Sequence, residues 1–189
     1  DKATLEDKIE VDNKLVIKER KMYLMLNKPL YCVTALKDDQ HKTVMDYVKV
    51  KERVFPVGRL DYNSSGLLLL TNDGDFSNKI MHPSNEVKKT YLVRVSKALR
   101  HHAATKLEKG VTLDDGSKTS RAKVYFHNPL LVEITVHEGK NRIIRRMLEA
   151  VGYEVRSLER VRVGNLDLGT LKPGRYRSLN KKDIDKIFM

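Results

Sequence analysis

The 189-residue sequence has no tryptophan and a single cysteine, Cys32. One thiol cannot form a disulfide within the chain, and it cannot supply the cysteine pair of a typical structural zinc site. No apolar run comes close to eighteen residues, which argues against a membrane-spanning helix, and no charged-then-apolar leader is present. These features predict a cytoplasmic protein that does not bind membranes.

Signatures of cofactor and metal chemistry are scarce as well. No glycine-rich loop matches a nucleotide-binding fingerprint, and the serines at 64–65 do not lie in a nucleophile elbow. None of the six histidines has a second histidine, cysteine or glutamate at the spacing of metal ligands. The sequence therefore predicts neither a metal site nor a bound cofactor.

Positive charge is abundant by contrast. The chain has 37 basic and 25 acidic residues, a net charge of +12, and residues 140–162 alone contain seven basic and three acidic ones. This excess favours a polyanion such as a nucleic acid as partner, although charge that only aids solubility would give the same total. With 6% aromatic residues, a broad platform for stacking single-stranded bases is not expected.

Short strand-like segments joined by hairpin-length links predict an α+β fold, with a mainly antiparallel mixed sheet and flanking helices. Capping residues place helix starts after Thr43, Asp73 and Ser96, and Gly110 and Gly152 end two helices. Strands are expected at 22–29, 31–36, 53–58, 67–71, 88–95, 121–126 and 130–136, with a strand pair over 153–164. Helices are expected at 43–48, 74–81, 97–110 and 141–152, and from residue 181. Residues 9–17 suggest a hairpin that turns at 12–14.

The helix NRIIRRMLEAVG at 141–152 separates into two faces. Its apolar stripe recurs with helical spacing at Ile144, Met147, Leu148 and Val151. Arg142, Arg145 and Arg146 lie one step away, where their guanidinium groups suit carboxylate or phosphate. Three interpretations remain open for this face: contact with an RNA backbone, an arginine paired with a buried aspartate, or an ordinary solvated surface.

The stretch PVGRLDYNSSGLLLLTNDG at 56–74 places Arg59 and Asp61 in a turn that precedes a buried strand. A surface ion pair would explain the two charges, and so would a carboxylate held on a rigid support for catalysis.

This stretch, together with NKP, HPSNEVKKTYLVRV and HEGKNRIIRRMLEAVG, resembles the RsuA/RluB/RluE/RluF family of ribosomal RNA pseudouridine synthases. The resemblance extends from about Tyr23 to the C-terminus and is closest to the RluB-type large-subunit branch. It implies residues 21–189 as a catalytic domain of two subdomains around a central cleft, and residues 1–20 as the remnant of an N-terminal S4-type RNA-binding domain. It also implies a monomer that isomerises a uridine of ribosomal RNA, most of all 23S rRNA, without a cofactor.

By the same resemblance, Asp61 is the catalytic carboxylate, Arg145 is its ion-pair partner, and the Tyr91 ring stacks on the target base. Arg59 would contact the phosphate of the extruded nucleotide or fill the place that it leaves. Substrate contacts are expected from Arg59, Leu67, Lys140, Asn141, Arg142, Ile144 and Arg146, and backbone contacts also from Arg160 and Arg162. The family motif usually has glutamine where this chain has Ile143, which puts one polar contact near the site in doubt.

Two alternatives compete with this prediction. A non-catalytic RNA-binding or ribosome-assembly factor could use the same scaffold, but it would not need Asp61, Tyr91 and Arg145 together. The same chemistry could also act on 16S rRNA. A DNA-binding transcription factor built on the arginine helix would require a helix-turn-helix partner, and the sequence predicts strands on both sides instead.

Overall fold

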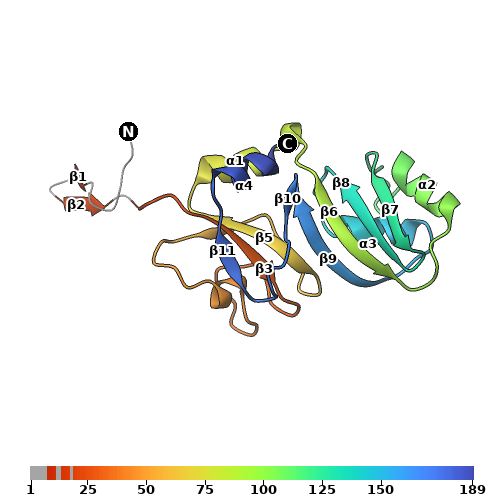
Figure 1. The fold of residues 1–189 in the computed structure, drawn as a ribbon, viewed down its shortest axis with the longest axis horizontal. Coiled ribbons are helices and arrows are strands. Elements are labelled where there is room, and N and C mark those ends of the chain that lie inside the picture. Colours follow the sequence, from red (N-terminus) through yellow and green to blue (C-terminus); the bar gives the residue numbers. More distant parts are fainter. Residues whose placement is uncertain (1–7, 12–13, 18) are drawn as a thin grey trace.

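The computed structural model describes residues 8–11, 14–17 and 19–189, and its main element is a nine-stranded sheet. The strands run in the order β11-β3-β5-β9-β6-β8-β7, with β4 beside β5 and β10 beside β9 (Figure 1). These strands are β3 (Tyr23–Lys28), β4 (Phe55–Val57), β5 (Ser65–Thr71), β6 (Lys89–Val95), β7 (Lys123–Asn128), β8 (Leu131–Val136), β9 (Val155–Val163), β10 (Leu166–Asp167) and β11 (Tyr176–Ser178). The helices are η1 (Val44–Tyr47), α1 (Gly74–Met81), η2 (Pro83–Asn85), α2 (His101–Lys109), α3 (Ile143–Ala150) and α4 (Lys181–Ile187). The predicted α+β class is confirmed.

All pairs in this sheet are antiparallel except β5–β9, which lies at its centre. The parallel contact is short and aligns Ser65 with Glu159 and Gly66 with Arg160. It joins the β11-β3-β5 half of the sheet to the β9-β6-β8-β7 half. Residues at this junction, on either half, are therefore brought to one place from distant parts of the sequence.

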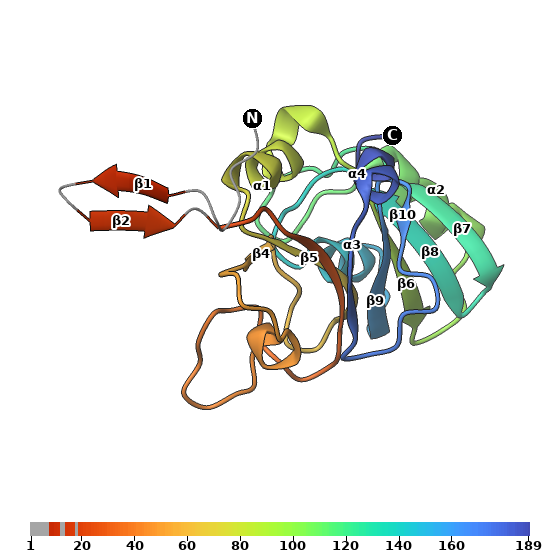
Figure 2. The same ribbon diagram turned by 60° about the vertical axis from the view of Figure 1, so that its left-hand side comes forward.

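Helices cover the sheet on both faces, so β5 is buried on both sides. Leu68 and Leu70 pack into the larger core cluster, which contains the apolar residues of α2 and α3. Leu67 and Leu69 pack into a smaller cluster that contains the apolar residues of α1 and α4. Figures 1 and 2 show α1 and α4 lying together over the β3-β5 half, and α3 against the other half. The continuous run of four leucines is thus explained by a strand without a solvent face.

Local capping signals were mostly reliable. Asp73 accepts a hydrogen bond from the Phe76 amide and begins α1 as predicted. Thr43 and Asp46 form a capping box at η1. The Ser96 prediction was wrong: α2 begins at His101, and the Ser96 hydroxyl accepts the Glu154 amide instead.

Three strand predictions also need correction. Residues 31–36 form no strand; only Val33 makes a bridge, to Thr43, and Cys32 is buried within a loop. The expected pair over 153–164 is one long strand, β9, whose partner β10 follows Gly164 and Asn165. Residues 176–178 form the edge strand β11, where no strand was predicted.

At the N-terminal end, β1 (Lys8–Val11) and β2 (Lys14–Ile17) pair antiparallel as predicted. The expected turn residues 12–13 lie outside the described residues. The assignment of residues 1–20 to a separate RNA-binding domain stays a prediction. Within the described part of the chain, every helix is too short or too polar to cross a bilayer.

Candidate active site

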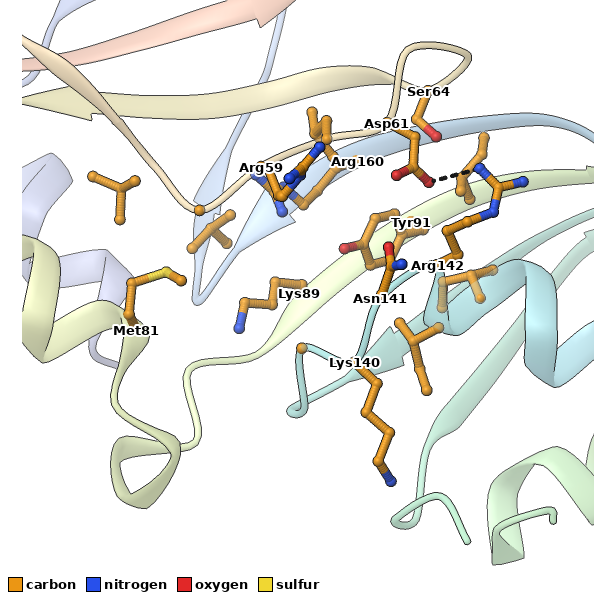
Figure 3. A pocket seen from close by; sticks show the side chains of 18 of the residues that line it. Arg59, Asp61, Ser64, Met81, Lys89, Tyr91, Lys140, Asn141, Arg142 and Arg160 are labelled. Carbon is orange, nitrogen blue, oxygen red and sulfur yellow. Dashed lines mark hydrogen bonds and ion pairs between the residues drawn. The ribbon is translucent and has the colours of Figure 1, made fainter. Parts of the chain in front are cut away.

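A cavity of about 470 Å³ lies at the centre of the sheet, where its two halves meet. Its walls come from the loop after β4, the start of β6, the segment before α3 and the centre of β9. This volume is within the range of small-ligand sites. Seven residues predicted from the sequence as site residues line this cavity (Figure 3): Arg59, Asp61, Tyr91, Lys140, Asn141, Arg142 and Ile144.

The loop that carries Asp61 is fixed at the residue before it. Leu60 is buried, and its amide and carbonyl both bond to the Thr34 hydroxyl, at 3.1 and 2.8 Å. Downstream, the Ser64 amide donates to the Asp61 carbonyl at 3.0 Å and closes a tight turn. With its neighbours anchored on both sides, the Asp61 carboxylate is held at the edge of the cavity.

Lys28 supports this turn from inside the protein. Its side chain is fully buried, and its ammonium donates to the carbonyls of Ser64 at 2.8 Å and Pro29 at 3.0 Å. Burial lowers the pKa of Lys28, while the negative charge of Asp61 opposes that shift. The NKP element is therefore part of the architecture that positions Asp61.

The ion-pair partner of Asp61 differs from the prediction. Arg142 Nη1 lies 3.3 Å from Asp61 Oδ2, whereas Arg145 makes no ion pair with this carboxylate within 4.0 Å. The helical pattern had placed Arg142 inside the helix, but Arg142 is its N-cap and has a left-handed backbone with φ of 54°. Its side chain therefore leaves the helical face and reaches Asp61.

Arg145 contacts the same turn at another point. Its Nη2 donates to the Asn63 carbonyl at 2.9 Å and to the Ser64 hydroxyl at 3.4 Å. Its buried Nε has no hydrogen-bond partner among the described residues. Burial lowers the pKa of Arg145, the positive charge of Arg142 adds to this shift, and the charge of Asp61 opposes it. Arg145 thus stabilises the Asp61 turn through the Asn63 carbonyl and the Ser64 hydroxyl.

Tyr91 lies on β6 in the wall of the cavity and is 9% exposed. A register shift between Thr90 and Tyr91 interrupts the pairing of β6 with β9 and places Tyr91 opposite Arg160. Figure 3 shows the Tyr91 ring between the Asp61–Arg142 pair and Lys89. An aromatic ring at this position can stack with a planar base that enters the cavity.

Two other predicted contacts need correction. Leu67 is fully buried in the smaller core cluster and does not line the cavity, where Leu69, two residues later on the same face, does. Arg146 is also absent from the wall, because Asp114 at 3.0 Å and Asp115 at 2.9 Å hold its guanidinium. Arg160, predicted to contact the RNA backbone, does line the cavity, where it is 6% exposed and donates to the Leu67 carbonyl at 2.8 Å.

Arg146 nevertheless influences the cavity indirectly. Its Nη1 donates to the Asn141 carbonyl at 3.0 Å, and Asn141 lines the wall. Ile143, at the position where the family resemblance implied a glutamine, is buried in the larger core cluster and lines the cavity with an apolar side chain. No polar group of this residue reaches the site.

Two polar lining residues, Lys89 and Ser64, were not predicted as site residues from the sequence. Lys89 is half-buried in the cavity wall, two residues before Tyr91. Ser64 is buried beside the Asp61 turn. The period-2 pattern of β6 could have indicated Lys89, because residues 89 and 91 share one face of the strand.

Comparison with protein families places this site in context. Residues 22–150 match the family model described as RNA pseudouridylate synthase. The chain is 41% identical over 188 residues to an uncharacterized RNA pseudouridine synthase of Aquifex aeolicus, covering 96% of this chain and 76% of that protein. It is also 41% identical over 194 residues to ribosomal large subunit pseudouridine synthase B of Bacillus subtilis, covering 98% and 79%.

The fold comparison agrees with the sequence comparison. A crystal structure of a pseudouridylate synthase superposes with a TM-score of 0.84 and 31% identity, covering 97% of this chain and 81% of that one. The dual-specificity RNA pseudouridine synthase RluF of Escherichia coli K12 is 39% identical over 165 residues, covering 87% of this chain and 57% of that protein.

Proposed function

Since the chain belongs to the RNA pseudouridylate synthase family and is an RNA pseudouridine synthase, we propose that it modifies large-subunit ribosomal RNA with Asp61 as its catalytic carboxylate. The proposal has two parts, the identity of the reacting group and the identity of the RNA. Each part has its own support and its own test.

The reaction is an isomerisation. The N1–C1′ bond of a uridine breaks, the uracil turns, and C5 forms the new bond to C1′, while C5 releases a proton and N1 gains one. No atom is added overall. The enzyme must take the base out of its stack and place an anionic group beside the junction of ribose and base.

The observation that carries the proposal is that Asp61 is the single carboxylate among the described residues that line the cavity. The Arg142 guanidinium lies 3.3 Å from Asp61 Oδ2 and fixes the orientation of the carboxylate. The side chain is largely sheltered, with 22% exposed, so the carboxylate can meet a base without a full hydration shell.

Tyr91 and the apolar lining supply the place for the base. The Tyr91 ring gives the cavity a planar surface. Ile143, Ile144 and Leu158, which also line the cavity, add apolar contacts. Stacking of a base on an aromatic ring contributes about 1–3 kcal/mol. That contribution helps to offset the cost of extruding the uridine, which is a few kcal/mol.

The choice of large-subunit RNA is supported by the relative of Bacillus subtilis, which is named for that subunit and aligns with 98% of this chain. The net charge of +12 suits a long polyanion. Backbone contacts position such an RNA, whereas the target uridine is selected through RNA shape and unpaired bases.

The test is a separate incubation of 23S and 16S ribosomal RNA with the protein, followed by pseudouridine mapping at nucleotide resolution. A new pseudouridine in 23S rRNA is the expected result. A new site in 16S rRNA alone would overturn the choice of RNA. RNA binding without product in either RNA would favour the non-catalytic binding factor.

A further inference from the structure

The cavity contains more positive charge than its carboxylate can balance. Lys140 pairs with Glu138 at 3.0 Å, and Arg142 pairs with Asp61 at 3.3 Å. The other basic residues of the wall have no carboxylate within 4.0 Å among the described residues. These three are Arg59, Lys89 and Arg160. Figure 3 shows them on the Met81 side of Tyr91, away from the Asp61–Arg142 pair.

Arg160 is the fixed member of this group. It lies at the centre of β9, opposite Tyr91 on β6 and Gly66 on β5, and is 6% exposed. Its Nε donates to the Leu67 carbonyl at 2.8 Å, which sets the plane of the guanidinium. The two terminal nitrogens make no hydrogen bond to the described residues and remain available to a ligand. A nearly buried arginine with free donors is well prepared to bind an anion.

Lys89 adds a second charge to the same wall. Burial lowers the pKa of Lys89, and the positive charge of Arg160 lowers it further. Two cations that repel one another in a partly dry cavity destabilise the free protein, because no carboxylate compensates them. An anion placed between them would remove this repulsion. Such an arrangement indicates a binding site for a negatively charged group.

We propose that Lys89 and Arg160, with Arg59 at the rim, form a subsite for one phosphodiester group next to the extruded uridine. This inference rests on the proposed function, because RNA supplies a phosphate on each side of every nucleoside. A phosphodiester that flanks the uridine is the anion that we assign to these cations. The subsite thereby contributes to binding of the nucleotide in the ground state and in the transition state alike.

The matched control lies one residue away. Lys88 has the same side chain and charge, but it is exposed and does not line this cavity. Lys89→Met and Lys88→Met remove the same charge from the same end of β6. Only Lys89→Met removes it from the proposed subsite.

The experiment is a binding cycle with a hairpin RNA that contains the mapped uridine. In one RNA series, a neutral methylphosphonate replaces each phosphodiester that flanks the uridine, one at a time. Affinities are measured in the Asp61→Asn background, so that no turnover occurs. At one of the two linkages, we expect the methylphosphonate and Lys89→Met each to weaken binding about tenfold. Combining the two changes should weaken binding no further than either change alone, because both remove the same contact.

Salt dependence gives a second readout. Loss of one phosphate contact lowers the slope of log affinity against log salt by about 0.7–0.9, and Lys89→Met is expected to show this change with the unmodified hairpin. Arg59 is exposed at the rim of the subsite. The loss of affinity in Arg59→Met is expected to be coupled to the loss caused by methylphosphonate at the same linkage. In the parent with Asp61 intact, Lys89→Met raises KM and leaves kcat within about twofold.

Three results would overturn the subsite. The first is an RNA affinity of Lys89→Met equal to that of its parent, and the second is a multiplication of the effects of Lys89→Met and methylphosphonate at both flanking linkages. The third is a coupling of Lys88→Met to the methylphosphonate that equals the coupling of Lys89→Met. If the parent forms pseudouridine and no coupling appears, the subsite fails and the proposed function stands. If the parent forms no pseudouridine in any ribosomal RNA, both fail.

Discussion

Gly66 and Arg160 face one another across the parallel pair of β5 and β9 at a distance that excludes any side chain on Gly66. A Cβ atom there would lie 2.2 Å from the Arg160 carbonyl oxygen and 2.6 Å from its amide nitrogen. Gly66 also has a φ of +113°, which favours glycine. This close approach joins the two halves of the sheet directly beneath the cavity.

Gly66→Ala is therefore expected to separate β5 from β9 and to destabilise the protein by about 3–5 kcal/mol. Urea unfolding measures this change. Gly74→Ala is the control, because no heavy atom lies within 4 Å of its Cβ position at the start of α1, and its stability should stay within about 1 kcal/mol of the parent. Equal stability of the two variants would contradict this explanation.

Tyr23→Phe tests a pH-dependent contact. The Tyr23 hydroxyl donates to Asp73, the N-cap of α1, at 2.6 Å, and burial together with Asp73 raises the pKa of Tyr23 to about 12 from 10.0. The unfolded chain loses this proton near pH 10 while the folded chain keeps it. The hydrogen bond therefore contributes fully below pH 10 and is lost as pH rises toward 12.

The expected difference in stability between parent and Tyr23→Phe is about 1 kcal/mol below pH 10, and it shrinks through the alkaline window. Urea unfolding at a series of pH values measures it, with Tyr125→Phe on the exposed face of β7 as the control. A difference that grows with pH would show that the assigned sign is wrong.

Lys28→Met tests the support beneath Asp61. The variant keeps an unbranched side chain but loses both donors to the carbonyls of Ser64 and Pro29. We expect kcat to fall at least about tenfold while RNA affinity is kept, because a small displacement of a reacting group is costly. Lys88→Met is the control. A fall in affinity with unchanged kcat would place Lys28 in RNA binding instead.

Substitution of Arg142 is expected to affect mainly catalysis, and substitution of Arg145 is expected to affect mainly stability. The Arg142–Asp61 pair is partly exposed, so Arg142→Met should change stability by less than about 1 kcal/mol but lower kcat about 100-fold. Arg145→Met removes donors from Asn63 and Ser64 and should destabilise by about 1–3 kcal/mol. Measurements of kcat and of urea unfolding on both variants test this. A large loss of kcat in Arg145→Met together with a large loss of stability in Arg142→Met would restore Arg145 as the partner of Asp61.

The sequence could indicate the strands, most caps and the residues around Asp61, because those features depend on local patterns. It could not distinguish Leu67 from Leu69 as a lining residue, since a continuous leucine run has no alternation to show which face is which. It also could not show that Arg142 leaves the helix, because only its left-handed backbone takes the side chain to Asp61.

Two further errors had long-range causes. Ser96 has the chemistry of a helix cap, yet its hydroxyl accepts an amide from residue 154, far along the chain. The burial of Arg160 was not predicted either, because charged residues seldom lie inside a sheet. Its burial depends on the Leu67 carbonyl and on the space that Gly66 leaves at the sheet centre.

The most direct measurement is single-turnover formation of pseudouridine by Asp61→Asn with saturating protein and the mapped RNA. The variant keeps the size of the side chain and removes its charge. The expected result is a rate at least about 1,000-fold below the parent, with RNA affinity within about twofold, while Asp185→Asn on α4 behaves like the parent. Formation of pseudouridine by Asp61→Asn at the parental rate would contradict the assignment of Asp61 as the catalytic carboxylate.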